Sequence, residues 1–193
     1  MIGRDGYMIP KKIHYCWFGK GKKSKLALKC IRSWRQYCPE YEVIEWNEEN
    51  FDIDMNGYTR MCYAEKKYAY LSAYVRLWVV EKYGGIYFDT DVEVIRSLEE
   101  LLRNDAFFCF ENKQYVASGL GFGSVAHGKV IQAMLKEYEI LLDGKNGVRM
   151  CPKLNTQALV ALGLKQNGRK QNVCEAVIYP MDVLNPYNSA TGK

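Results

Sequence analysis

Apolar and polar residues alternate along the chain in segments that predict strands and helices in turn. Buried or half-buried strands are expected at 12–18, 41–46, 86–88, 106–111, 115–124 and 176–179. An extended segment is expected at 92–95, directly after two aspartates. Helices are expected at 24–37, 65–83, 98–102, 129–142 and 156–164. Because strands and helices follow one another, the sequence predicts an α/β layered fold.

The length of 193 residues fits one compact domain. Residues 1–8 are polar and contain glycine, so we expect a loose leader there. Residues 9–193 are expected to form a single domain. Hydrophobic residues make up 48% of the chain, which is enough for a sizeable core.

The predicted helix at 65–83 is apolar around most of its circumference, but one sector differs. At 100° per residue, this sector holds Ala69, Ser72, Ala73 and Arg76. Small residues beside a single arginine indicate a face turned toward a ligand or a neighbouring backbone. The alternative is a buried Arg76 that pairs with a carboxylate for structural reasons.

Residues 84–94, GGIYFDTDVEV, are the most informative segment of the chain. A hydrophobic strand leads directly into Asp89 and Asp91, and residues two apart in an extended chain point to the same side. Open α/β sheets bind ligands at the carboxyl ends of their strands. Two carboxylates directed at one point repel each other unless a cation lies close by. Hard divalent ions such as Mg²⁺ or Mn²⁺ prefer oxygen ligands and can bridge to a diphosphate.

Composition and charge narrow the range of functions. The only histidines are His14 and His127, which excludes a histidine-rich metal site, and the 7 cysteines show no CxxC spacing of a zinc or redox site. The formal charge is +5, and lysines crowd the N-terminal region: Lys11, Lys12, Lys20, Lys22, Lys23, Lys25 and Lys29. Such a cluster either attracts phosphate-bearing ligands or an anionic membrane face, or is simply a solvated surface. No motif supports nucleic-acid binding.

No signal peptide precedes the first strand, and no apolar run is long enough to span a bilayer. We therefore expect a cytoplasmic protein, with peripheral contact to the inner face of the membrane as an additional expectation.

Residues 69–94 resemble the D-x-D sugar-binding region of a glycosyltransferase family. This family includes proteins related to the yeast initiating mannosyltransferase and to capsular polysaccharide sugar transferases, and the clostridial glucosylating toxins are more distantly similar. IPKKIHYCWFG at 9–19 resembles the opening strand of the family, and residues 30–50 resemble its next helix and strand. CPKLNTQAL at 151–159 resembles the family's Gly-Pro-x-x-x-Thr stretch.

The resemblance implies a Rossmann-like GT-A fold with a mixed central sheet and helices on both faces. It also implies a nucleotide-diphosphate sugar donor, with UDP as the expected nucleotide, a divalent metal, and retention of the anomeric configuration. The acceptor would be a saccharide or a lipid-linked saccharide, as in the synthesis of a bacterial surface or capsular polysaccharide.

The same resemblance assigns roles to individual residues. Trp17 falls where the family stacks the nucleobase, although the strand pattern alone equally suggests a core residue. Asp89 falls where an aspartate contacts the ribose and the sugar, Asp91 where an aspartate binds the metal, and Arg76 where an arginine holds the donor sugar. Ser72 and Ala73 fall on the donor-binding sector of the helix.

The chain departs from the family pattern at two places. Ser72-Ala73 stands where the family has Ser-Asp, so a sugar-binding carboxylate is missing. The family's closing segment with His and Ser-Trp does not follow NPYNSATGK at the end of the chain. Both departures suggest an alternative function, in which the chain binds a sugar nucleotide but transfers the sugar poorly or not at all.

Two other functional classes are weaker candidates. A haloacid dehalogenase-type phosphatase also ends a strand in D-x-D, but it requires Thr or Val at the position of Glu93 and a downstream acidic pair that this chain lacks. A purely structural module would leave the paired aspartates without a purpose.

Overall fold

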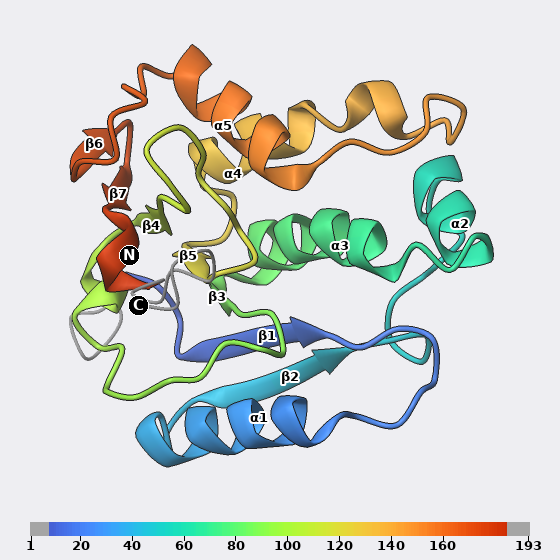
Figure 1. Cartoon of the computed structure of the whole chain (residues 1–193), viewed down its shortest axis with the longest axis horizontal. Helices are drawn as coiled ribbons and strands as arrows, with labels where there is room; N and C mark the ends of the chain where they lie inside the picture. The colour runs from blue at the N-terminus through green and yellow to red at the C-terminus, as the bar shows by residue number, and fades with distance from the viewer. Residues whose placement is uncertain (1–7, 185–193) are drawn as a thin grey trace.

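The computed structural model describes residues 8–184, within which seven strands form one sheet in the order β2-β1-β3-β5-β4-β7-β6 (Figure 1). The strands are β1 (Lys12–Cys16), β2 (Glu42–Trp46), β3 (Gly85–Tyr87), β4 (Ala106–Cys109), β5 (Phe122–Ser124), β6 (Gln171–Val173) and β7 (Ala176–Tyr179). Strand β1 pairs in parallel with both β2 and β3, and β4 pairs in parallel with β7. Strands β5 and β6 run antiparallel to their neighbours, so the sheet is mixed.

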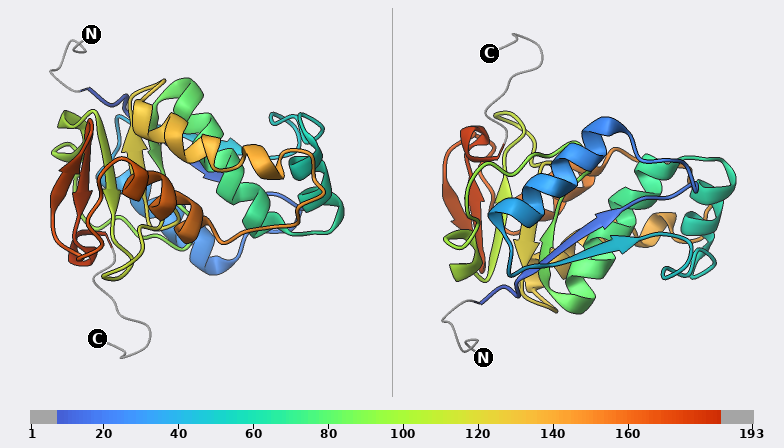
Figure 2. Two further views of the ribbon diagram at one scale, coloured as in Figure 1. Left: turned by 90° about the horizontal axis from the view of Figure 1, so that it is seen from above. Right: turned by 90° about the horizontal axis from the view of Figure 1, so that it is seen from below.

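Helices cover both faces of this sheet (Figures 1 and 2). The α-helices are α1 (Lys25–Tyr37), α2 (Gly57–Ala64), α3 (Tyr68–Tyr83), α4 (Lys129–Lys136) and α5 (Cys151–Ala161). Short 3-10 helices are η1 (Leu101–Arg103), η2 (Glu139–Leu141) and η3 (Met181–Val183). None of the helices within residues 8–184 is long and apolar enough to cross a membrane.

The two faces follow from the alternation of side chains along the strands. In β1, Ile13 and Tyr15 belong to the hydrophobic cluster that contains Trp34 of α1. Cys16 belongs instead to the cluster that contains Leu77 of α3 and residues of α4 and α5. The predicted α/β fold with a mixed sheet and helices on both faces is thereby confirmed.

Helix α1 shows how closely local sequence signals set the elements. Ser24 caps this helix, because its Oγ accepts a hydrogen bond from the backbone N–H of Ala27 at 3.1 Å. Such a cap satisfies one of the unpaired N–H groups of the first turn.

Several predicted elements differ in the structure. The helix expected at 65–83 begins only at Tyr68, because Lys66 has a positive φ of 56° that interrupts it. Helix α2 was not predicted from the sequence. Asn56 caps its N-terminus, and the side chains of Asn56 and Thr59 form the reciprocal hydrogen bonds of a capping box. The strand expected at 115–124 is reduced to Phe122–Ser124.

The extended segment expected at 92–95 does not join the sheet. Its polar backbone groups bond to side chains of α1, since Trp34 Nε1 donates to the carbonyl of Val92 and the N–H of Val94 donates to Ser33 Oγ. Helix α5 begins five residues before the predicted start at 156, with Pro152 in its first turn, where a missing N–H costs little. Of the predicted leader, residues 1–7 lie outside the described residues.

His14 lies fully buried in β1, beside the C-terminal end of α3. Trp46 Nε1 can only donate, so His14 Nδ1 accepts this bond at 3.1 Å. His14 Nε2 therefore carries the proton and donates to the carbonyl of Gly84 at 2.9 Å. Burial lowers the pKa of His14 from 6.5 to about 4. The histidine is a neutral structural residue.

This burial predicts a pH-dependent stability. Between pH 6.5 and about 4 the unfolded chain binds a proton at His14 that the folded chain does not, so the free energy of unfolding falls as the pH falls through this window. The expected loss is on the order of 3 kcal/mol. Urea unfolding measured across this pH range should show a shallower dependence for His14→Gln than for the parent chain. The control is His127→Gln, which removes the second, exposed histidine of the chain. Equal pH dependence of His14→Gln and the parent would contradict the assignment.

Candidate functional site

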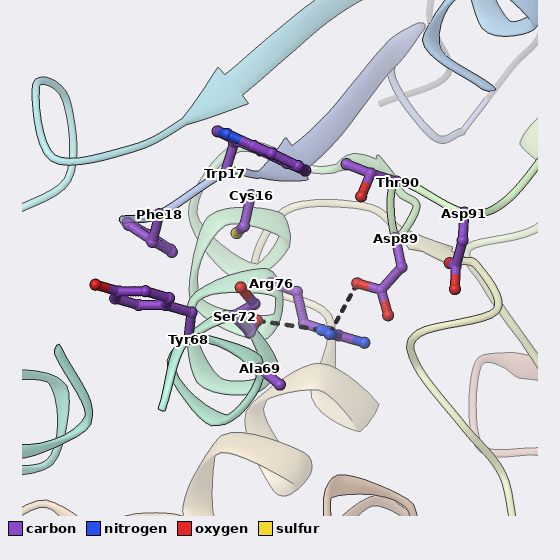
Figure 3. A pocket seen from close by; sticks show the side chains of 10 residues that line it. All are labelled: Cys16, Trp17, Phe18, Tyr68, Ala69, Ser72, Arg76, Asp89, Thr90 and Asp91. Atoms are coloured by element: carbon purple, nitrogen blue, oxygen red, sulfur yellow. Dashed lines mark hydrogen bonds and ion pairs between the residues drawn. The ribbon is translucent and has the colours of Figure 1, made fainter. Parts of the chain in front are cut away.

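A cavity of about 320 Å³ opens where β1 and β3 end (Figure 3). Three elements supply its walls: the residues after β1, one side of α3, and the residues after β3. The lining residues are Cys16, Trp17, Phe18, Tyr68, Ala69, Ser72, Arg76, Asp89, Thr90 and Asp91. Because β1 and β3 are parallel neighbours, their carboxyl ends meet at the same edge of the sheet. This is the location at which open α/β sheets bind ligands.

An ion pair between Arg76 and Asp89 forms the inner wall of the cavity. Arg76 Nη2 lies 2.9 Å from Asp89 Oδ1, and the side chains are 5% and 36% exposed, respectively. The hydroxyl of Tyr87 donates to the same Oδ1 at 3.0 Å. Arg76 Nε donates to the carbonyl of Ser72 at 3.1 Å, and the guanidinium carbon lies 4.8 Å from the centre of the Tyr87 ring. Both charged groups are therefore held in one orientation.

Burial and charge act in opposite directions on this pair. Burial alone would lower the pKa of Arg76, but the Asp89 carboxylate, together with Tyr87, Cys151 and Cys16, outweighs burial, and the net shift of the pKa is upward. Burial raises the pKa of Asp89 above its ordinary value, while Arg76 and the Tyr87 hydroxyl counteract that rise. Arg76 is therefore a permanent cation. Asp89 takes up a proton at a higher pH than an exposed aspartate would.

Asp91 lies in a turn, and the extended geometry expected for Asp89-Thr90-Asp91 is wrong. The N–H of Val92 donates to the carbonyl of Asp89 at 3.1 Å, which closes a four-residue turn. Both aspartates still line the same cavity, as predicted (Figure 3). Asp91 is exposed, and among residues 8–184 its carboxylate makes no hydrogen bond or ion pair. It is available for a ligand, whereas Asp89 Oδ1 is occupied.

These residues fit a divalent metal only in part. Within residues 8–184 no three His, Cys, Asp or Glu side chains come together as a metal site. Mg²⁺ commonly keeps several waters and binds through one or two carboxylates together with phosphates of the substrate. Asp91, with Asp89 beside it, matches that smaller donor set. Such a site is expected to hold metal well only when a phosphate ligand is present.

Trp17 lies at the cavity wall and is half-buried, and it also packs against the hydrophobic cluster that contains Trp34, so its role in base stacking stays a prediction. Its Nε1 donates to the carbonyl of Gly21 at 2.7 Å, and the ammonium of Lys23 lies 5.5 Å from the ring centre. The indole is oriented by its own loop. One end of the cavity is thus aromatic, and the other end carries Arg76 and the two aspartates.

The remaining two predicted residues lie on α3. Ser72 lines the cavity, and its carbonyl orients Arg76. Ala73 is only 3% exposed and is not among the lining residues, and its carbonyl accepts a hydrogen bond from the Tyr138 hydroxyl at 3.3 Å. The roles of both residues in donor binding stay predictions.

Sequence reasoning missed Gly119, which packs against the back of the ion pair. The N–H of Asp89 donates to the carbonyl of Gly119 at 3.2 Å. A Cβ on Gly119 would collide with Asp89 Oδ2 and lie 3.0 Å from Arg76 Nη1. Thr156 of α5 holds the same loop, because its Oγ1 accepts from the N–H of Val116 at 2.9 Å. The glycines at 119–123 were the visible signal, but they were interpreted as part of a strand.

Comparisons with known proteins agree with this geometry. The structure is similar to that of PaToxG glycosyltransferase, with a TM-score of 0.63 and 18% identity over 79% of this chain and 68% of the other. A glycosyltransferase involved in the glycosylation of the major capsid of PBCV-1 gives a TM-score of 0.48 and 9% identity over 88% and 82% of the two chains, a likeness too distant to support an argument. The fold is therefore that of a GT-A-type glycosyltransferase.

The sequence comparisons show what part of the chain is similar to. Residues 24–108 match the family described as "Glycosyltransferase sugar-binding region containing DXD motif". This segment contains Asp89-Thr90-Asp91, and the predicted resemblance to DXD-containing glycosyltransferases is confirmed. Inositol phosphoceramide mannosyltransferase 3 of Schizosaccharomyces pombe is 31% identical over 106 residues. This match covers 51% of the chain but only 29% of the yeast protein.

The position of Gly119 leads to a testable prediction about stability. Gly119→Ala should lower the free energy of unfolding by about 1–3 kcal/mol, because the new methyl group forces Asp89 or Arg76 to move. Gly21→Ala is a matched control, since a Cβ there meets no atom within 4 Å and the backbone φ is not positive. Urea unfolding of the two variants and the parent provides the measurement. If Gly119→Ala were as stable as Gly21→Ala, the close packing behind the ion pair would be refuted.

Proposed function

We propose that this chain is a metal-dependent glycosyltransferase that takes a sugar from a nucleotide-diphosphate sugar, with UDP as the expected nucleotide. The observation that carries the proposal is the cavity itself. It brings an aromatic wall, a fixed arginine and an exposed carboxylate together at the ends of two parallel strands. Its volume of about 320 Å³ lies at the lower end of the range for small-molecule sites, about 300–1,000 Å³.

Each wall matches one part of such a donor. The half-buried Trp17 ring offers a flat surface on which a nucleobase can stack. Asp91 would hold Mn²⁺ or Mg²⁺, and the ion would neutralise charge on the leaving diphosphate. Arg76 provides a charge-assisted donor for sugar hydroxyls, and Ser72 lies beside it on α3. Asp89, fixed by Arg76 and Tyr87, would offer an oriented carboxylate to the ribose and the sugar.

The finer assignments rest on the family resemblance and are part of the same proposal. Transfer would proceed with retention of the anomeric configuration. The acceptor would be a saccharide or a lipid-linked saccharide in the synthesis of a bacterial surface or capsular polysaccharide. A lipid-linked acceptor would require a cytoplasmic chain to work at the inner face of the membrane.

A second candidate function is donor binding with little or no transfer, and Ala73 is the observation that favours it. The resembling enzymes carry a carboxylate at this position, one helical turn before Arg76, and the methyl side chain of alanine cannot accept a hydrogen bond. In this chain Arg76 is instead oriented by Asp89 and by the Ser72 carbonyl. The two functions differ in one readout, which is the release of free sugar from a bound sugar nucleotide by the parent chain.

Stacking on Trp17 is tested by fluorescence. UDP with Mn²⁺ should quench the emission of the parent chain, and the quenching should disappear in Trp17→Phe. Trp78→Phe should keep it, because Trp78 packs against Trp46 and Phe51 and does not line the cavity. Trp17→Ala should weaken UDP binding roughly five- to 150-fold, from a stacking contribution of about 1–3 kcal/mol. Undiminished quenching in Trp17→Phe would rule out this tryptophan as the base-stacking residue.

A further inference from the structure

The outer face of helix α1 is strongly cationic. Between residues 25 and 37 the helix contains four basic residues and no acidic one. All four are exposed: Lys25, Lys29, Arg32 and Arg35. Two leucines stand among them in solvent, Leu26 at 54% and Leu28 at 43% exposure. Figures 1 and 2 show α1 as the outermost layer on its side of the sheet.

The segment at 92–96 extends this face. It is fixed to α1 by the bonds from the Val94 N–H to Ser33 Oγ and from Trp34 Nε1 to the Val92 carbonyl. Ile95, which follows, is 69% exposed, and Arg96 beside it is also exposed. We call the combined set the cationic α1 surface: Lys25, Leu26, Leu28, Lys29, Arg32, Arg35, Ile95 and Arg96.

The charges of this surface are largely uncompensated. Among the ion pairs within residues 8–184, the cationic α1 surface contributes one, between Lys29 Nζ and Glu93 Oε2 at 2.7 Å. By contrast, Lys11, Lys12 and Lys23 of the same N-terminal region each face a glutamate. On an ordinary solvent-exposed protein surface, positive and negative side chains are interspersed. The partner of this surface should therefore be anionic.

The exposed aliphatic side chains indicate which kind of anion. A helix with lysines and arginines around exposed leucines is typical of proteins that lie on a membrane surface, where the cations meet anionic headgroups and the apolar side chains enter the acyl boundary. A nucleic acid offers no apolar layer for Leu26 and Ile95. We infer that the cationic α1 surface binds the anionic face of a lipid bilayer.

The surface is connected to the candidate donor site through the chain itself. Residues 92–96 directly follow Asp91, which lines the cavity. Docking of α1 on a bilayer would thus hold the cavity close to the membrane and to an acceptor carried by a lipid. This last step rests on the proposed function, whereas membrane binding itself does not.

Co-sedimentation of the full chain with vesicles tests the inference. The parent should bind vesicles of phosphatidylcholine mixed with phosphatidylglycerol but not vesicles of phosphatidylcholine alone, and high salt should release it. Each cation near an anionic surface strengthens binding roughly fivefold, so Lys25→Gln with Arg32→Gln should weaken it roughly thirtyfold. Lys145→Gln with Lys165→Gln removes the same charge from exposed positions outside this surface and should have little effect.

A second variant separates a bilayer from any other polyanion. Leu26→Ser with Ile95→Ser should reduce vesicle binding while binding to single-stranded RNA stays the same. The inference would be overturned if the parent did not bind vesicles. It would also be overturned if Lys25→Gln with Arg32→Gln lost no more binding than Lys145→Gln with Lys165→Gln, or if the double serine variant bound vesicles as well as the parent. UDP-dependent quenching measured on the same variants reports the donor site separately, so failure of the membrane surface and failure of the proposed function are distinguishable.

Discussion

The buried ion pair between Arg76 and Asp89 is the interaction on which the candidate site depends. A guanidinium that is only 5% exposed needs an opposite charge and hydrogen-bond acceptors, because an unpaired buried charge is strongly unfavourable. The fold supplies both, with Asp89 from the end of β3 and the Ser72 carbonyl from the preceding turn of α3. The pair therefore fixes the distance between α3 and β3 on the side where the cavity opens.

This constraint makes the surroundings of Asp89 and Asp91 different. Asp89 is held by Arg76 and by the Tyr87 hydroxyl, which leaves it little freedom to follow a ligand. Asp91 lies in the turn beyond, exposed and without a bond among the described residues. A rigid carboxylate next to a free one suits a site in which one group orients the donor and the other binds a metal together with the phosphates of the substrate.

Much of the fold could be predicted because its signals are local. The apolar run at 12–18 and the helical pattern at 24–37 each act within a few residues, and the structure has β1 and α1 at these places. The pairing of Arg76 with a carboxylate was also foreseen as one of two alternatives. Which carboxylate pairs with Arg76 depends on tertiary packing, because residues 76 and 89 meet only when α3 packs on the sheet.

The errors arose where tertiary contacts replace local patterns. The D-x-D segment was expected to be extended, but the backbone turns after Asp89, so a period of two does not apply there. Residues 92–95 have the composition of a strand, yet side chains of Ser33 and Trp34 take their hydrogen bonds. Gly119 could not be recognised as a site residue, because it matters by leaving room for the Asp89 side chain. A single sequence does not show which glycine lies against which side chain.

The most direct test of a metal-dependent nucleotide site is calorimetric titration of UDP into the parent chain, Asp91→Asn and Glu100→Gln. Glu100 is an exposed carboxylate outside the cavity, so its variant controls for the lost charge. The account predicts that the parent and Glu100→Gln bind UDP with Mn²⁺ present and lose binding when EDTA removes the metal. Asp91→Asn should melt at the parental temperature but show no gain from Mn²⁺. Binding of UDP by Asp91→Asn with the same dependence on Mn²⁺ as the parent would contradict the account.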